Sequence, residues 1–389
     1  MGHYAGQQVS SGEQNILFGR FTGQQLTTGD HNIFAGLYSG GKCTLTGGYN
    51  IGFGFHVLSR NTSGTNNIAM GCLAMSGEVV TGEKNIAIGE NAGRDIKCGS
   101  YNTLIGVGAG ALSDCTNDNV FIGRNAGYCV KVVTTGGTAN KNVFMGSYAG
   151  KCRCHGDYNI AFGKEAFRGS STYSTNTGSD NVVLGCGAAK NMSSGSRNVV
   201  IGRDAMGGST DKTGSRNITI GTQAGRNISS GSDNIFLGCY TGAANTSGCY
   251  NFIAGIMAGG SGAISGKCNT AIGPYAAQHL QAGSYNVLFG PEAGRCINNG
   301  SYNIFFGHKA GCTITSGQEN IAIGKNVQLA SATGNCQLLI GNGVNTYVKG
   351  DQSFNVCLGN SNAIKAMATG TMCATCFVGC GAGLTGLPG

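Results

Sequence analysis

The chain has 389 residues, of which 71 are glycine and 3 are proline, and only 11% are charged. Because 40% of the residues are hydrophobic and the net charge is only +8, the composition excludes an intrinsically disordered protein. The basic residues form no cluster, which argues against a nucleic-acid-binding surface, and no run of about 20 apolar residues predicts insertion into a membrane.

One motif recurs along almost the whole chain. Its anchor is an asparagine followed by three mostly apolar residues and a glycine, and positions are counted from this anchor. The anchors, in chain order, are Asn15, Asn32, Asn50, Asn67, Asn85, Asn102, Asn119, Asn142, Asn159, Asn181, Asn198, Asn217, Asn234, Asn251, Asn269, Asn286, Asn303, Asn320, Gln337 and Asn355. Twelve of the nineteen spacings are 17 residues, and glycine stands at +4 in all twenty repeats. Such a period predicts a repeat architecture.

The apolar triplet is rich in Ile, Val and Phe and lies between Asn and Gly, which predicts a short β-strand. Seventeen residues are too few for a pair of helices but suffice for one coil of a solenoid. Glycines at +4, +8 and −3 predict corners where the backbone adopts positive φ. We therefore predict an all-β fold, a parallel β-solenoid of about 20–22 coils with a 17–18-residue period, forming one domain over residues 1–383.

The anchor asparagines of successive coils are predicted to stack at about 4.8 Å. Stacked asparagine side chains can form a hydrogen-bonded ladder, so we expect the anchors to be structural. The ladder is represented by Asn85, Asn102, Asn119, Asn217, Asn234, Asn286, Asn303 and Asn320.

Each strand has two faces, with +1 and +3 on one side and +2 on the other. Positions +1 and +3 are almost wholly aliphatic or aromatic, and we assign them to the core. Position +2 then points outward, although it carries no charge in twenty repeats; its large members are Leu104, Phe121, Phe144, Phe236, Leu288, Phe305 and Leu339. This +2 stripe predicts lateral association of protomers, most simply as a trimer. A flattened solenoid that buries both strand faces within one chain is the alternative.

The consensus N-[IV]-x-[IFL]-G-x-x-A-G resembles the head repeats of trimeric autotransporter adhesins (YadA-like heads) and the related repeats of phage and large-virus tail-fibre proteins. The resemblance covers about residues 2–383 and depends on the anchor Asn, the +4 Gly and the +7 Ala. It implies a left-handed parallel β-roll, three chains packed side by side, and a role in adhesion or fibre building. The period in this chain is longer than the family's, and its cysteines are more numerous.

Eighteen cysteines predict an oxidising final location. Adjacent coils, about 4.8 Å apart, match the Cα separation of a disulfide. The position of each cysteine in the period therefore predicts the bonds Cys98–Cys115, Cys129–Cys152, Cys249–Cys268 and Cys296–Cys312. Cys72, Cys186, Cys239 and Cys380 stand at +5 without such a partner, and are expected to be either free, buried thiols or bonded to another protomer.

Two coils are longer than the others, and their extra segments are 128–141 and 168–180. Loops on rigid scaffolds often carry binding residues, so Lys131, Tyr173 and Asn176 are candidates for contact with a glycan or receptor. Tolerated surface loops are the alternative. Residues 384–389 continue a Gly-X-Y pattern from Gly383, which predicts the start of a collagen-like segment.

The sequence offers no pattern that predicts catalysis, because its six histidines are scattered and its acidic residues are not paired. Short Cys runs at 152–155 and 373–376 lack a second half at zinc-site spacing, so we predict no metal or cofactor. Neither end of the repeat shows an atypical capping coil. The predicted function is a structural subunit of an extracellular, cell-surface or virion-surface fibre, assembled as a homotrimer or a head-to-tail homopolymer. An adhesin whose loops contact host glycans or surface proteins is the alternative.

Overall fold

The structure is a computed structural model that describes residues 2–130, 139–153, 155–170, 176–353 and 355–359, together with the backbone of 364–366 and 372–374. Every named element of these residues is a β-strand. The chain divides into two compact units, Met1–Asp233 and Asn234–Gly389.

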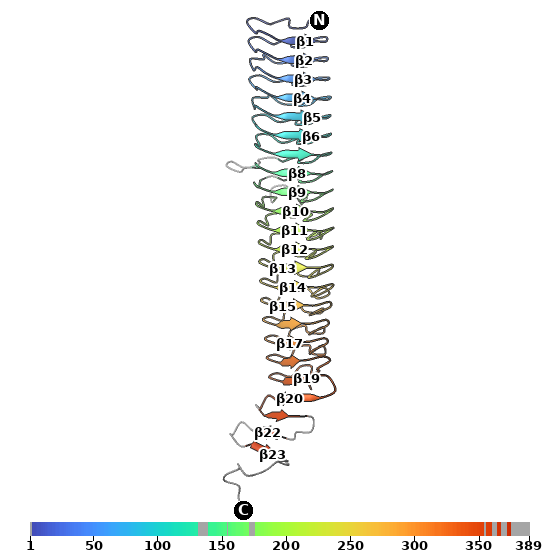
Figure 1. The fold of residues 1–389 in the computed structure, drawn as a ribbon. Coiled ribbons are helices and arrows are strands. Elements are labelled where there is room, and N and C mark those ends of the chain that lie inside the picture. The colour runs from blue at the N-terminus through green and yellow to red at the C-terminus, as the bar shows by residue number, and fades with distance from the viewer. Residues whose placement is uncertain are drawn as a thin grey trace, which may run out of the picture. The chain divides into compact units, whose positions relative to one another are not determined.

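The first unit is a parallel β-solenoid with one strand in each coil (Figure 1). Its strands are β1 (Ile16–Phe18), β2 (Ile33–Ala35), β3 (Ile51–Phe53), β4 (Ile68–Met70), β5 (Ile86–Ile88), β6 (Thr103–Ile105), β7 (Val120–Ile122), β8 (Val143–Met145), β9 (Ile160–Phe162), β10 (Val182–Leu184), β11 (Val199–Ile201) and β12 (Ile218–Ile220). Each strand begins directly after an anchor and pairs in register with the next, as Leu104 does with Phe121. The predicted fold class and period are confirmed.

The second unit begins with the same architecture and then changes it. Strands β13 (Ile235–Leu237), β14 (Phe252–Ala254), β15 (Thr270–Ile272), β16 (Val287–Phe289), β17 (Ile304–Phe306), β18 (Ile321–Ile323) and β19 (Leu338–Gly341) are parallel. Strands β20 (Thr346–Gly350), β21 (Val356–Leu358), β22 (Ile364–Ala366) and β23 (Met372–Ala374) follow as an antiparallel meander. Parallel stacking therefore ends earlier than the predicted residue 383, with fewer coils than predicted. The predicted tail 384–389 lies outside the described residues.

Gln337, the anchor of β19, lies where the parallel pattern stops and makes different hydrogen bonds from the asparagine anchors. Its main-chain N–H and its Nε2 donate to Oδ1 of Asn320 at 2.9 and 3.3 Å, as an asparagine would. Its longer side chain turns the oxygen back, so that Oε1 accepts the N–H of Ser331 in the same coil at 2.9 Å. That oxygen is then occupied within its own coil, and the next strand, β20, runs antiparallel to β19.

The core is built by position +2, so the predicted orientation of the strands was wrong. Side chains of the supposed outward stripe are fully buried, namely Leu104, Phe121, Phe144, Phe236, Leu288 and Phe305, while Leu339 is half-buried. The +7 alanines lie beside them in the core. The first and third residues of every strand from β1 to β19 are instead half-buried or exposed.

The reason lies in the volume that positions +2 and +8 share inside each coil. A Cβ added at Gly150 (+8) would collide with the ring of Phe144 (+2), and the same clash recurs at Gly127 with Phe121. In several coils where +2 is small, +8 is large: Gly52 is accompanied by Leu58, Ala69 by Met75, and Ala161 by Phe167. Ala87 with Gly93 and Ala271 with Ala277 are exceptions. The two positions therefore fill one interior space, which fixes +2 on the inside.

The predicted role of the glycines holds at +4 but not at −3. Gly106, at +4, has φ 128°, which an L-residue rarely adopts. At −3 the constraint is distance, since a Cβ on Gly64 would lie 2.7 Å from the carbonyl oxygen of Gly82 in the next coil. Positions −1 and +6 hold non-glycine residues at positive φ, such as Tyr101 (60°) and Asn91 (56°). Hydrogen bonds from these residues to the preceding coil hold that conformation.

Candidate interaction surface

The outward face of the sheet consists of the side chains at +1 and +3. In the first unit it runs over β1 to β12, and 23 of its 24 residues are apolar, Thr103 being the exception. Its most exposed members include Phe18 (70%), Phe53 (41%) and Phe162 (41%). In the second unit the face continues over β13 to β19 with one polar residue, Thr270. A continuous apolar surface of this kind marks an interaction site.

One edge of the outward face is formed by position −1, which precedes each anchor. Tyrosines are frequent there, and Tyr101 and Tyr158 are about half exposed. Their hydroxyls accept hydrogen bonds from Lys84 and Lys141 of the preceding coil at 2.8 and 2.9 Å. The bond to Tyr101 raises the pKa of Lys84, and Glu83 adds to this effect. This edge is therefore polar, with as many acidic as basic residues: Lys84, Lys141, Arg197 and Arg216 are balanced by Asp118, Asp180, Asp233 and Glu319. The face itself carries no charge.

The opposite edge is formed by position +5, after the +4 glycine. Apolar residues are exposed there too, namely Leu37, Phe55, Val107 and Ile256. The unpaired cysteines predicted at this position are free thiols, but their predicted burial was wrong, since Cys72 and Cys186 are exposed and Cys239 is half-buried. Cys380 lies outside the described residues. Other members of this edge are charged, mostly basic, namely Arg20, Glu90, Arg124, Lys164, Arg203 and Lys325, so the apolar surface extends beyond the strands only at some coils.

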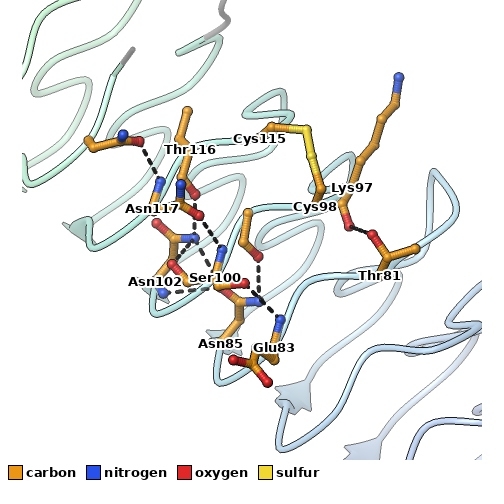
Figure 2. Close-up of a disulfide and its surroundings, with 12 residues drawn as sticks. Thr81, Glu83, Asn85, Lys97, Cys98, Ser100, Asn102, Cys115, Thr116 and Asn117 are labelled. Atoms are coloured by element: carbon orange, nitrogen blue, oxygen red, sulfur yellow. Dashed lines mark hydrogen bonds between the residues drawn. A yellow bond between two sulfur atoms is a disulfide. The ribbon is translucent and has the colours of Figure 1, made fainter.

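The anchor asparagines form the predicted ladder inside each unit (Figure 2). The side-chain oxygen of each accepts the main-chain N–H of the next anchor and, in nearly every case, its Nδ2 as well. Examples are the bonds from Asn102 to Asn85, Asn119 to Asn102, Asn217 to Asn198, Asn251 to Asn234, Asn303 to Asn286 and Asn320 to Asn303. The ladder is buried and structural, so it offers no binding site.

Position −2 carries a second ladder that the sequence reasoning missed. The N–H of Glu83 donates to the hydroxyl of Ser100 at 3.0 Å, and the N–H of Ser100 donates to Oδ1 of Asn117 at 2.8 Å (Figure 2). The same link joins Ser179 to Ser196 and Ser284 to Ser301. Ser, Asn or Asp occupies −2 in thirteen of the twenty repeats, which was the available signal.

The structure contains one of the four predicted disulfides, Cys98–Cys115, with a Cα separation of 4.7 Å (Figure 2). The other three bonds are not formed, since Cys152, Cys268, Cys296 and Cys312 are free. In the pairs Cys249–Cys268 and Cys296–Cys312 the two residues stand one position apart in the period. Their side chains therefore do not stack directly on each other in adjacent coils. Cys129 and Cys152 share a position, but Cys152 is buried and Cys129 is only half-buried.

The predicted contact residues of the long coils do not form a described surface. Asn176 is fully buried: its Oδ1 accepts the N–H of Ser170 at 3.0 Å, and its Nδ2 donates to the carbonyl oxygen of Cys152 at 2.6 Å. Asn176 therefore holds the loop to the preceding coil, and its assignment to ligand contact was wrong. Lys131 and Tyr173 lie outside the described residues.

Two buried cations are further features that the sequence reasoning missed. The guanidinium of Arg153 donates to the carbonyl oxygens of Met192 (2.7 Å) and Gly178 (3.1 Å) and lies 4.0 Å from the ring of Phe167. Lys212 is buried, and its Nζ donates to the carbonyl oxygen of Thr210 at 3.1 Å. Burial lowers the pKa of Lys212 to about 8. Each occupies an interior position, so its charge serves the fold rather than an external ligand.

Within the described ranges, no group of three or more His, Cys, Asp or Glu side chains is placed to hold a metal ion. The described residues also include no helix long and apolar enough to cross a membrane. Comparisons with family models, curated proteins and solved structures gave no match. The resemblance to adhesin heads and tail-fibre repeats therefore stays a prediction, and the outward face is the feature from which a function can be argued.

Proposed function

We propose that the protein is a structural subunit of a fibre in which copies of the chain associate side by side through the outward face. The observation that carries this proposal is the double column of side chains at +1 and +3 in each unit, which is free of charge and apolar except at Thr103 and Thr270. A sheet face that stayed in water would gain nothing from excluding every Lys and Glu at so many positions.

The size of the outward face supports association between copies of the chain. Coils rise by about 4.8 Å and a three-residue strand spans about 10 Å, so the twelve strands of the first unit present roughly 580 Å². Two such faces in contact bury roughly 1,200 Å², which exceeds the approximately 1,000 Å² expected of a specific interface. The face has the same period in every copy, so equivalent coils of two chains can match along its length.

Three chains around a common axis are the assembly that we propose, at the surface of a cell or virion. The two edges differ in charge: the −1 edge carries as many acids as bases, whereas the +5 edge carries five bases and one acid, namely Arg20, Arg124, Lys164, Arg203, Lys325 and Glu90. This difference favours a heterologous contact that closes into a ring over a face-to-face pair. The Cys98–Cys115 disulfide between adjacent coils suits an oxidising location.

Charge placed on the outward face tests the proposal. Ile88→Glu combined with Ile105→Glu puts two carboxylates at +3 of neighbouring strands, and Val79→Glu is the matched control because Val79 is an exposed residue outside the strands. We expect the wild type and the control to sediment as trimers and to form fibres in negative-stain images. The double variant should remain folded by circular dichroism and sediment as a monomer. A wild type that is monomeric at high concentration, or a double variant that assembles like the control, would contradict the proposal.

A further inference from the structure

Six asparagines of the chain begin an Asn-X-Ser/Thr acceptor sequence for N-glycosylation: Asn61, Asn191, Asn217, Asn227, Asn245 and Asn299. In the structure these six asparagines differ in how far they are buried. Asn61, Asn217 and Asn245 are buried, with exposed fractions of at most 1%, whereas Asn227 and Asn299 are exposed. Asn191 is half-buried. Half of the acceptor sequences therefore lie where no sugar can be accommodated.

N-glycosylation joins a large, hydrated saccharide to the Nδ2 atom of the asparagine, and in a folded protein this group must stand at the surface. Nδ2 of Asn217 already donates to Oδ1 of Asn198 at 3.1 Å and to the carbonyl oxygen of Gly231 at 2.9 Å. Nδ2 of Asn61 donates to the carbonyl oxygen of Gly64 at 3.1 Å. A saccharide on either atom would remove a hydrogen bond of a buried amide and prevent the coil from closing on its neighbour.

The secretory pathway of eukaryotic cells adds this saccharide while the chain is still unfolded, when all six asparagines are accessible. We infer that the protein folds in a compartment without N-glycosylation, and reaches its place of action already folded or from a cell that lacks this modification. The inference concerns where the chain folds and is independent of the proposed assembly.

The test compares the full chain made in the cytosol of cultured eukaryotic cells with the same chain directed into the secretory pathway by an added signal peptide. Folding is read as protease resistance and solubility, and glycan occupancy by mass spectrometry. We expect the cytosolic chain to be folded. The secretory chain should carry saccharide on Asn61, Asn217 or Asn245 and should lose most of its protease-resistant fraction.

Two rescues distinguish glycosylation from other causes of misfolding. The variant Ser63→Ala, Thr219→Val, Ser247→Ala removes the three buried acceptor sequences while keeping the asparagines; Ser63 and Ser247 are exposed, and the buried Oγ1 of Thr219 has no hydrogen-bond partner. Its matched control, Asn227→Gln with Asn299→Gln, removes two exposed acceptors.

We expect the triple variant, and wild type treated with an inhibitor of N-glycosylation, to recover the protease-resistant fraction in the secretory pathway. The control should not recover it. A wild type that folds normally in the secretory pathway, or the failure of both rescues, would overturn the inference. Because the measurement is folding of the chain and not its assembly, failure here leaves the proposed function to its own test.

Discussion

Asn102 is tied to Asn85 through one oxygen atom. Both its main-chain N–H and its Nδ2 donate to Oδ1 of Asn85, each at 3.0 Å. The same Nδ2 donates to the carbonyl oxygen of Thr116 at 2.7 Å, and Oδ1 of Asn102 accepts the N–H of Asn119. A single buried side chain therefore satisfies polar groups of three successive coils.

The first prediction concerns this link. Asn102→Ala leaves the N–H of Asn119 and the carbonyl oxygen of Thr116 buried without their partners, and should lower the free energy of unfolding by about 2–4 kcal/mol. Chemical denaturation followed by circular dichroism measures the change. Asn299→Ala, at an exposed asparagine, should change it by less than about 0.5 kcal/mol. Equal stability of the two variants would show that the ladder does not stabilise the fold.

The second prediction tests the shared volume of positions +2 and +8. Gly150→Phe inserts a ring into the space of Phe144 and should be strongly destabilising, by more than about 3 kcal/mol. Adding Phe144→Ala recreates the arrangement of the next coil, where Ala161 lies with Phe167, and should recover most of the loss. Thermal denaturation of the single and double variants gives the coupling. Additive effects of the two substitutions would refute the shared space.

The third prediction concerns the disulfide. Cys98→Ser with Cys115→Ser opens a bond that closes 17 residues, and should cost about 3 kcal/mol of stability by the loop-entropy estimate. The melting temperature of this variant should match that of reduced wild type. Cys72→Ser removes an exposed free thiol and serves as the control, which should melt with the oxidised wild type. No difference between oxidised and reduced wild type would contradict the prediction.

The fourth prediction is a pH dependence from Lys212. Burial lowers its pKa from 10.5 to about 8, an effect that Asp211 opposes and Arg226 increases. Between pH 8 and 10.5 the unfolded chain binds more protons at this group than the folded chain, so the contribution of Lys212 to stability rises with pH in that window. Below pH 8 the full cost, at most about 3 kcal/mol, is present.

Lys212→Met keeps the length of the side chain and removes the charge, so it should stabilise the protein at pH 7 and flatten this rise. Denaturation midpoints of wild type and variant between pH 7 and 10 provide the comparison. Lys190→Met, at a half-buried lysine paired with Glu165, is the control for loss of a lysine as such. Parallel pH profiles for wild type and Lys212→Met would exclude the buried amine as the cause.

The repeating part of the fold could be predicted because the same residue types recur at the same positions of each coil. An anchor such as Asn85, the triplet after it and the glycine at +4 together define a strand and a corner, and the period of 17 fixes the register. The change at β19 was missed because Gln337 differs from asparagine by one methylene group, and the period alone does not reveal what that group does.

The orientation of the strands was predicted wrongly for an identifiable reason. Alternation shows that Leu104 and its neighbours in the triplet lie on opposite faces, but both faces are apolar and alternation alone does not say which is inside. The deciding information lay further along the coil, in the pairing of Phe144 with Gly150 and of Ala161 with Phe167. For the cysteines, equal position in the period predicted Cys98–Cys115 correctly, and Cys296 and Cys312, one position apart, form no bond. Equal position was not sufficient, because Cys129 and Cys152 share a position but differ in burial and are not bonded.

Gln337 has a consequence for how the size of such a protein is set. In the stack, the side-chain oxygen of each anchor accepts a hydrogen bond from the following coil. These contacts do not limit the number of coils, because any number of identical coils would satisfy them. The number of coils is therefore set by the sequence. The parallel stack ends at Gln337, whose main-chain N–H donates to the preceding anchor as that of an asparagine would, but whose Oε1 accepts a hydrogen bond within its own coil. A longer or shorter stack could thus arise by duplicating or deleting coils upstream of Gln337, without any change to the contacts between the remaining coils.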